Sequence, residues 1–252
     1  MVRRSLTDDI LIATLRSVYI IMRFRHSDDV WREFPELVPG TLLARRLSSG
    51  VRVDSAVERF TAPAAERLTH GSESDFPEIQ AWRRVFSRMG LKPTQYRCAA
   101  ESLLRRFRKA GSLPRLHPMI DLCNAASMAF AIPIAVFDIE RIAGNLAVRH
   151  ATGAETFSTF AGEQERPDPN EIIFADDAGR AHARRWTHRQ GADSSVGPET
   201  RDVLIVAEAM HATAQADLAR LMQALASEIE VGWGAAPTTR ILSAASPELT
   251  LG

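Results

Sequence analysis

The stretch PIAVFDIERIAGNLAVRH, residues 133–150, marks the point where the chain changes from helical to strand-like periodicity. It holds two short β-rich runs separated by Gly144 and Asn145, which are typical turn residues. More runs of this kind follow up to residue 209, and a last helix is expected over residues 211–230. Helices, then short strands, then a helix predict an α+β domain with a mostly antiparallel sheet of short strands and flanking helices.

Upstream of this stretch, the apolar residues recur mainly at helical spacing. The exception is a turn predicted at Pro39–Gly40, followed by a short strand. A moderate helix over residues 55–68 is expected to be interrupted at Pro63. Thr94 is expected to cap a further helix that Gly111 closes. The other predicted helices span residues 76–90 and 119–130.

Composition places the chain among ordinary globular proteins. It has 252 residues, 45% of them hydrophobic and 25% charged, which suits one large domain or two small ones. Because the formal net charge is zero, any anion binding must depend on local clusters of charge. Cys98 and Cys123 have no metal-binding or redox spacing, so we interpret them as reduced, buried thiols of a cytoplasmic protein.

No domain-sized linker divides the chain, and we expect one main domain over residues 28–231. The N-terminal arm, residues 1–27, is expected to be a helical or strand-like segment that packs on this domain. Acidic residues precede its apolar run and Arg16 interrupts it, which argues against a signal peptide or a membrane span. The C-terminal tail, residues 232–252, has no strong pattern and is expected to be mobile.

Basic residues gather in two places. From Arg83 to Arg115 there are ten Lys or Arg residues and one acid, Glu101. This surface is either solvated or faces phosphates, as nucleic-acid binding by a neutral protein requires. The stretch RRWTHRQGADSSVGPET, residues 184–200, has four basic or His residues around one Trp and no acid in its first nine positions. Which anion these side chains face is an open question at the level of sequence.

The helix over residues 119–130 carries Asp121, Asn124 and Ser127 at i, i+3 and i+6, beside several alanines. Polar groups on one broad face next to small residues are compatible with a helix that lines a pocket. The alternative is that they hydrogen-bond neighbouring loops. The spacing alone favours this second reading.

Familiar catalytic signatures are missing from the sequence. It has no phosphate-binding glycine loop, no G-x-G-x-x-G after a strand and no G-x-S-x-G elbow. His182 and His188 could share a strand face, but no ligand pattern accompanies them, so neither a metal nor another cofactor is expected. A hydrolase without an obvious nucleophile would have to position a water and stabilise charge.

Five segments, in order, resemble the tRNA-editing domain of the β subunit of bacterial phenylalanyl-tRNA synthetase, and most of all the free-standing proteins made of that domain alone. The resemblance spans roughly residues 30 to 215. Each motif is weak singly, and their order and spacing give the resemblance its specificity. The segments are MIDLCN (119–124), IPIAVFDIERIAG (132–144), VRHATGAETF (148–157), NEIIFADDAG (170–179) and RRWTHRQGADSSVGPETRDVLIV (184–206).

The resemblance implies trans-editing, the hydrolysis of the ester between a wrong amino acid and the terminal adenosine of tRNA. Family catalysis depends on a positioned water and the terminal ribose, with no covalent intermediate and no metal. Asn124 and Ser127, with backbone amides near HATGAE, would hold the ester and its water. Trp186 would pack or stack beside the terminal adenosine. The predicted tRNA contacts are Arg105, Arg108, Arg149, Arg185, Trp186, His188 and Arg189, although Arg149 could instead extend to solvent.

The sequence departs from the synthetase pattern where the amino acid would be recognised. Ala135 stands where the synthetase has a His that helps to recognise the tyrosine hydroxyl, and Val206 stands where it has a Glu, with Glu208 close by. Because that recognition needs paired polar groups, tyrosyl-tRNA(Phe) is disfavoured. One branch of the family deacylates canavanyl-tRNA(Arg), and the guanidinium-like side chain of canavanine needs a carboxylate.

Three carboxylates in pocket-associated motifs are candidates for that role: Asp121, Glu155 and Asp176. Their alternative roles are a helix cap, a strand–turn bond and a turn bond respectively. Canavanine, or another arginine-like misacylation, is therefore the expected substrate. Two other classes stay open: a tRNA-binding module without hydrolysis, and a subunit-interaction protein that docks through residues 83–115. The sequence does not specify the oligomeric state.

Overall fold

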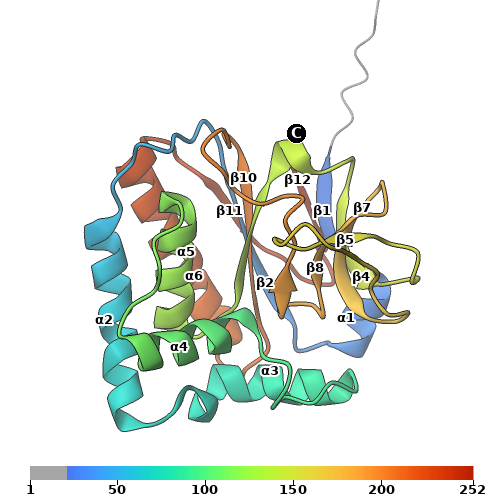
Figure 1. Cartoon of the computed structure of the whole chain (residues 1–252), viewed down its shortest axis with the longest axis horizontal. Helices are drawn as coiled ribbons and strands as arrows, with labels where there is room; N and C mark the ends of the chain where they lie inside the picture. The colour runs from blue at the N-terminus through green and yellow to red at the C-terminus, as the bar shows by residue number, and fades with distance from the viewer. Residues whose placement is uncertain (1–21, 252) are drawn as a thin grey trace, which may run out of the picture.

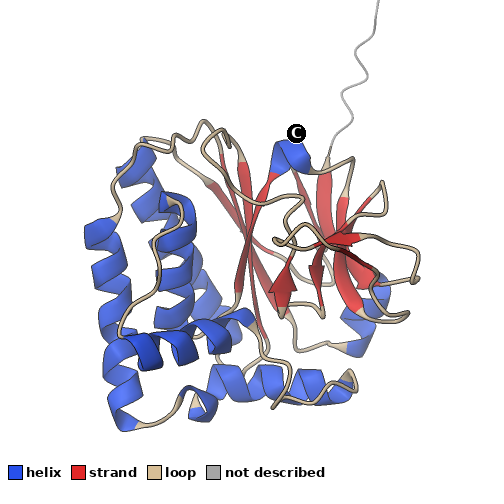
Figure 2. Ribbon diagram, in the orientation of Figure 1, coloured by secondary structure: helices blue, strands red, loops and turns tan. Residues whose placement is uncertain are grey.

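The computed structural model describes residues 22–251 and has helices on one side and strands on the other (Figures 1 and 2). The α+β prediction is confirmed, because every pairing between named strands is antiparallel except that of β1 with β4. Within the described residues, no helix is both long and apolar enough to cross a membrane. The expected arm at residues 1–21 lies outside the described part of the chain.

A four-stranded sheet forms the centre of the molecule, in the order β11 (Thr238–Ile241), β2 (Val38–Ala44), β10 (Val203–Ala209) and β3 (Ile134–Asp138). All seven residues of β10 are buried. Its alternate residues Val203 and Ile205 belong to one hydrophobic core, whereas Leu204 and Val206 belong to another. Because successive strand residues point to opposite faces, this sheet is covered on both sides. Helices α2 (Asp54–His70), α5 (Pro118–Phe130) and α6 (Ala214–Trp233) lie on one side of it (Figure 1).

The other face of the central sheet packs against a six-stranded sheet, and a core that includes Phe24, Phe137, Phe174 and Leu204 fills the space between them. Helix α3 (Pro77–Arg88) runs along one end of the sheets, and α4 (Ala99–Ala110) packs across the ends of α5 and α2 (Figure 1). In order, the six strands are β12 (Glu248–Thr250), β1 (Arg23–His26), β4 (Leu146–His150), β7 (Ile172–Asp176), β8 (Ala181–Arg184) and β9 (Arg189–Gln190). The remaining elements are α1 (Asp28–Glu33), η1 (Glu73–Asp75), η2 (Ile139–Arg141) and the hairpin of β5 (Phe157–Ser158) and β6 (Gln164–Glu165).

Three predicted helix and strand boundaries are wrong. Pro39 and Gly40 lie inside β2 and make no turn. Gly40 lies close to α6, because a Cβ at this position would lie 3.0 Å from the side chain of Met222, which would have to shift to make room. Pro63 does not interrupt α2, which continues from Asp54 to His70. Thr94 caps no helix, since α4 begins at Ala99, whose N–H donates to the carbonyl of Thr187 at 2.8 Å.

The described residues of the expected N-terminal arm and of the expected C-terminal tail both form strands of the sheets. The end of the predicted arm is β1, which pairs with β4 and β12. The predicted tail, for which the sequence shows no strong pattern, contains β11 and β12, which extend the edges of two sheets. These strands are three or four residues long, too short for their polar–apolar alternation to stand out in the sequence.

Candidate functional site

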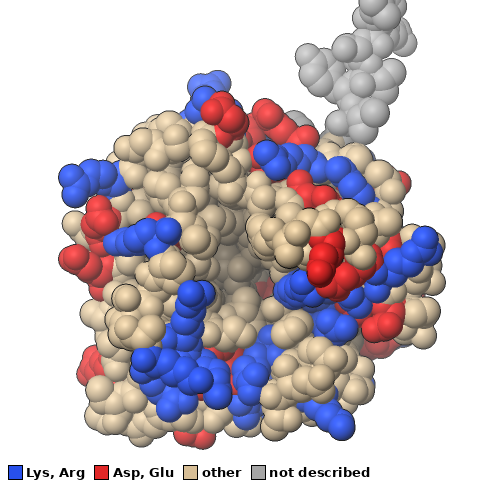
Figure 3. Space-filling model, viewed as in Figure 1, with Lys and Arg blue, Asp and Glu red and all other residues tan. Residues whose placement is uncertain are grey.

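A small pocket with a volume of about 50 Å³ opens between the two sheets. Strands β3 and β10 form one wall, the turn between β8 and β9 forms the other, and the first residue of α4 contributes at the rim. Figure 3 shows a hollow near the middle of this face, with Lys and Arg side chains below it. Its lining residues are Ala99, Pro133, Ile134, Ala135, Phe174, Ala183, Trp186, Thr187, His188, Arg189, Gln190, Val206 and Glu208.

Ala135 and Val206, the two positions where the sequence departs from the synthetase pattern, lie side by side on adjacent strands of the central sheet. They are direct partners in the antiparallel pairing of β3 with β10, and both line the pocket. Glu208 follows Val206 by two residues, so it lies on the same face of β10. The wall therefore combines small and apolar side chains with one carboxylate.

Glu208 is 2% exposed, and its carboxylate makes hydrogen bonds to two aromatic side chains, an indole and an imidazole. Its Oε1 accepts from Trp186 Nε1 at 2.9 Å and lies 2.6 Å from Nε2 of His26, which comes from β1 of the other sheet. Among the described residues, no hydrogen bond involves Oε2. Glu208 therefore presents a positioned carboxylate oxygen at the pocket.

The turn between β8 and β9 has an unusual backbone. Arg185 and Trp186 both adopt the left-handed conformation, with φ of 47° and 56°, which is rare for residues other than glycine. At Trp186, burial of the side chain offsets the cost of this backbone conformation. The ring is 0% exposed and packs edge-on against Trp82 and Phe34. A fully buried indole is not placed to stack on an adenosine base, so that part of the sequence prediction is wrong.

The pKa of His188, in the same turn, is lowered by its surroundings. Burial lowers its pKa first, and the nearby Arg185 and Arg189 lower it further, against the hydrogen bond to Arg97. Its Nδ1 lies 2.7 Å from the carbonyl oxygen of Arg97. Because a carbonyl only accepts, Nδ1 carries the proton and Nε2 has a free lone pair.

Thr187 adds a second polar group to the same wall. Its Oγ1 is buried and has no hydrogen-bond partner among the described residues. A buried hydroxyl without a partner is costly, and a water or ligand oxygen within hydrogen-bonding distance would satisfy it. Thr187 and Glu208 are absent from the site residues predicted from sequence. The two-residue strand period that links Val206 to Glu208 is the signal that would have identified the second.

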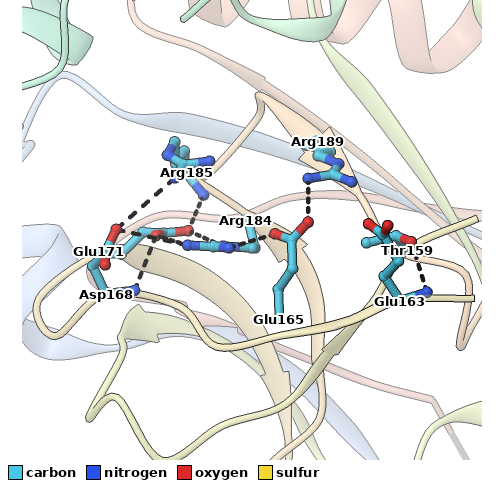
Figure 4. Close-up of polar contacts among 8 residues, drawn as sticks. All are labelled: Thr159, Glu163, Glu165, Asp168, Glu171, Arg184, Arg185 and Arg189. Carbon is cyan, nitrogen blue, oxygen red and sulfur yellow. Dashed lines mark hydrogen bonds and ion pairs between the residues drawn. The ribbon is translucent and has the colours of Figure 1, made fainter. Parts of the chain in front are cut away.

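The arginines of residues 184–189 face carboxylates of this same chain. Arg184, 4% exposed, binds Glu171 at 2.8 Å and Glu165 at 2.6 Å. Arg189 also binds Glu165, at 2.9 Å, and Arg185 lies 3.9 Å from Asp168. Figure 4 shows this row, with Arg184 between Glu171 and Glu165. The anions that these arginines face are thus carboxylates of residues 165–171 of the same chain.

The predicted catalytic residues do not lie in this pocket. The Ser127 hydroxyl is fully buried and donates to the carbonyl of Ile132 at 2.7 Å, which closes the end of α5. Asn124 and Asp121 line a separate pocket between α2, α5 and the α4–α5 loop. Asp121 accepts from the N–H of Leu116 at 2.9 Å, a bond to the loop before α5, whereas the N-cap of this helix is His117. The structure therefore does not bring Asn124 and Ser127 to the pocket with Ala135 and Val206.

Glu155 and Asp176 are also occupied elsewhere. Glu155 binds Arg149 at 2.5 Å and accepts from the N–H groups of Thr152 and Gly153. Burial acts to raise the pKa of Glu155, but these donors outweigh it and lower the pKa to about 2. Asp176 accepts from the N–H of Ala143 and binds Arg180, so both carboxylates have the turn-stabilising roles. Arg149 accordingly bonds Glu155 and the adjacent backbone.

The basic surface at residues 83–115 is less unbalanced than the sequence indicates. Arg105 and Arg108, both predicted tRNA contacts, lie 3.7 and 2.8 Å from the buried Glu73. Acids from outside this segment approach four of the ten cations, Arg88, Arg105, Arg108 and Arg115, so this surface carries less unpaired charge than the local count. Arg83 and Arg97 pair with Glu101, the one acid within the segment.

In the described part of the chain, no group of three or more His, Cys, Asp or Glu residues lies close enough together to hold a metal ion. His182 and His188 do not form a pair. His182 is buried in β8 and bonds Ser194 and Asp176, whereas His188 lies in the turn beyond.

Comparison with known families identifies the family to which the chain belongs. A family model described as the B3/4 domain matches residues 81–230, more than half of the chain. The chain belongs to the B3/4 domain family. The matched range contains β3, β10 and the β8–β9 turn, and so every element that lines the pocket.

The relatives of this B3/4 domain protein are synthetase subunits. It is 30% identical over 169 residues to the phenylalanine–tRNA ligase beta subunit of Nocardia farcinica, covering 66% of this chain and 19% of that protein. It is 28% identical over 163 residues to the same subunit of Dickeya dadantii, covering 62% and 20%. The chain thus spans about a fifth of the length of these relatives. These similarities relate it to a domain of a tRNA synthetase subunit.

A solved structure is also similar: an N-terminal fragment of the phenylalanyl-tRNA synthetase beta subunit from Pyrococcus horikoshii. The TM-score is 0.45 at 11% identity, over 85% of this chain and 49% of that one.

Proposed function

We propose that the protein is an aminoacyl-tRNA deacylase that acts in trans on tRNA carrying an arginine-like amino acid, of which canavanyl-tRNA(Arg) is the leading example. The coarse part of this proposal, a tRNA-related function, is supported by family membership and by the synthetase relatives. The observation that supports it most is the pocket itself. It is built around Ala135 and Val206, the positions that resemble the amino-acid site of the editing domain, and it contains Glu208.

Glu208 favours a cationic side chain in this pocket. A carboxylate accepts strongly from a guanidinium, and burial among apolar residues increases the strength of that pairing. Glu208 thus replaces Asp121, Glu155 and Asp176 as the carboxylate that would recognise the substrate. Ala135 leaves space where a larger polar residue would stand and offers no hydrogen bond to a phenol. Tyrosyl-tRNA(Phe) is therefore the weaker alternative.

Hydrolysis would use a water held in the β8–β9 turn. No Ser or Cys lines this pocket among the described residues, so a covalent intermediate is not expected. His188 Nε2 has a free lone pair and would accept a proton from the water, and the Thr187 hydroxyl would help to orient that water. As the water attacks the ester carbonyl, the bond to the ribose oxygen breaks. The ribose hydroxyl and the free amino acid are the products.

The deciding experiment is release of the amino acid from a panel of charged tRNAs: canavanyl- and arginyl-tRNA(Arg), and tyrosyl- and phenylalanyl-tRNA(Phe). We expect selective release from canavanyl-tRNA(Arg). Selective release from tyrosyl-tRNA(Phe) would contradict the proposed specificity. Binding of these tRNAs without release of any amino acid would leave a tRNA-binding module as the function.

The pH dependence of turnover tests the role of His188. Since the neutral imidazole is the proton acceptor and its pKa is lowered, turnover should be constant at neutral pH and fall only as the pH drops below about 6.5, the ordinary His value. His188→Asn should reduce kcat about 100-fold and remove this acid limb. Thr187→Val should lower kcat less and keep the limb. An unchanged pH profile in His188→Asn would exclude His188 as the base.

A further inference from the structure

We propose that the β5–β6 hairpin presents Phe160 as a stacking platform for an unpaired base of the tRNA acceptor end, beside the pocket. This inference rests on the proposed function, because it concerns how the same site receives its substrate. Phe160 is 72% exposed, and it is the one exposed Phe, Trp or Tyr side chain within residues 22–251. Leu116 and Val231, the other large apolar side chains that are exposed there, are aliphatic.

Hydrogen bonds among residues 159–163 stabilise the hairpin tip that carries Phe160. Thr159, 4% exposed, accepts at Oγ1 from the N–H groups of Ala161 and Glu163. Its own N–H donates to the carbonyl of Glu163 at 2.9 Å, and its carbonyl accepts from Gly162 at 3.0 Å. These bonds hold the backbone on both sides of Phe160 and leave its ring exposed. A ring that is already exposed needs no rearrangement of the hairpin before a flat ligand binds to it.

The same hairpin is attached to the pocket wall. Glu165 of β6 binds Arg189, which lines the pocket, and also binds Arg184. On the β5 side, the carbonyl of Ser158 accepts from the N–H of Ala192 at 2.9 Å. A Cβ on Gly191 would lie 2.9 Å from the ring of Phe157, so the hairpin rests directly on the chain that leaves β9. Figure 4 shows Thr159 and Glu163 next to the Glu165–Arg189 pair.

The chemistry near Phe160 matches single-stranded nucleic acid. Arg189 is 41% exposed in its side chain, and Arg166 is exposed just after β6. An exposed ring on a segment that also carries arginines can stack an unpaired base, whereas paired bases have no free face for it. The exposed Glu163 opposes this charge in part, so stacking is expected to contribute more than phosphate contacts. The 3′ end of tRNA, which carries the ester, is unpaired.

The first test compares Phe160→Ala with Phe160→Trp on two substrates: charged tRNA and a methyl ester of the same amino acid. Loss of the ring should raise KM for the tRNA about tenfold and leave kcat unchanged, while tryptophan keeps KM near the wild-type value. Both variants should hydrolyse the methyl ester like the wild type, because it has no base. Leu116→Ala and Val231→Ala are the matched controls and should leave both substrates unaffected. An unchanged KM for tRNA in Phe160→Ala would overturn the inference.

The second test needs no hydrolysis. Uncharged tRNA with 2-aminopurine at its terminal position loses fluorescence when that base stacks. We expect the wild type and Phe160→Trp to quench this fluorescence and Phe160→Ala to quench it much less. If the wild type binds and quenches without deacylating any charged tRNA, the stacking role stands and the proposed activity fails. Equal quenching by the wild type and Phe160→Ala would exclude the stacking role whatever the activity.

Discussion

At the scale of single residues, Glu208 links parts of the chain that are far apart in sequence. Its carboxylate joins Trp186 of the β8–β9 turn to His26 of β1, and its backbone carbonyl accepts from Trp82 of α3 at 3.2 Å. A buried charge is tolerated only when it is paired and hydrogen-bonded. Glu208 is thus a structural centre as well as the proposed substrate carboxylate, and its two roles need separate measurements.

Glu208→Ala should destabilise the fold strongly. The change leaves Trp186 Nε1 and His26 Nε2 buried without their partner, which costs about 3–5 kcal/mol when one member of a buried pair is removed. The measurement is the urea midpoint of unfolding. Glu248→Ala, which removes an exposed carboxylate 3.8 Å from Arg23, is the control and should change stability by less than about 1 kcal/mol. Equal effects of the two changes would refute the structural role of Glu208.

The proximity of Ala135 and Val206 was within reach of sequence reasoning, whereas the partners of the arginines were not. Both apolar positions lie in strong strand patterns, and the family resemblance identifies them. The acids that bind Arg184 and Arg189 lie 13 to 24 residues away along the chain, in a loop whose path no local pattern specifies. A count of charges in one segment cannot include acids that folding brings to it.

At the scale of elements, the contact between β2 and α6 depends on the absence of a side chain. Gly40 of β2 lies directly under Met222 and Leu218, and a Cβ there would lie 3.0 to 3.2 Å from both. These distances are shorter than ordinary van der Waals contact, so the side chains of Met222 and Leu218 would have to shift or repack. Sequence reasoning placed a turn at this glycine because Pro-Gly usually marks one. Its real reason is the close approach of a helix to a strand.

Gly40→Ala should therefore destabilise the protein by about 1–2 kcal/mol, the usual cost of an added methylene in a packed core. Gly50→Ala is the matched control, because nothing lies within 4 Å of the added Cβ at that position. Chemical denaturation of the two variants beside the wild type measures the difference. If Gly40→Ala is no less stable than Gly50→Ala, the close packing of α6 on β2 is not a constraint.

The helices with strong apolar stripes could be predicted from the sequence, and the short elements could not. Prediction and structure agree to within two residues at each end for α3 and α5. The start of α4 differs by five residues, because the segment before Ala99 leaves the helix to bond the β8–β9 turn. Strands β11 and β12 exist only as partners of β2 and β1, which is a tertiary effect.

At the scale of the whole molecule, both cysteines report on global unfolding. Cys98 and Cys123 are 0% and 2% exposed, and burial raises the pKa of each thiol to about 12. At pH 8 the native protein should therefore react with iodoacetamide only when it unfolds, at a rate set by the population of unfolded chains. Mass spectrometry with increasing urea should show both sites labelled together. Rapid labelling of either thiol without urea would contradict the packing described for α4 and α5.

Acid should also unfold the molecule as a whole, because several native carboxylates have lowered pKa values. Besides Glu155, these include Glu165, Glu171 and Asp176, for which burial raises the pKa but arginine and backbone hydrogen bonds lower it more. Asp217 follows the same pattern, with a pKa of about 2. A carboxyl that is more acidic in the folded state contributes stability at pH above its unfolded value. That contribution is lost as the pH falls towards the folded value.

Glu155→Gln isolates one part of this acid sensitivity. Glutamine removes the charge that Arg149 and the loop amides stabilise, so at pH 7 the variant should be less stable by about 2 kcal/mol. The ordinary pKa of Glu155 is 4.5 and its folded value is about 2, so the gap between variant and wild type should close as the pH falls from 4.5 to 2. Urea midpoints at pH 7, 5, 4 and 3 measure it. Glu199→Gln, at an exposed position, should follow the wild type throughout. A gap for Glu155→Gln that does not change with pH would show that lost packing, and not charge, is responsible.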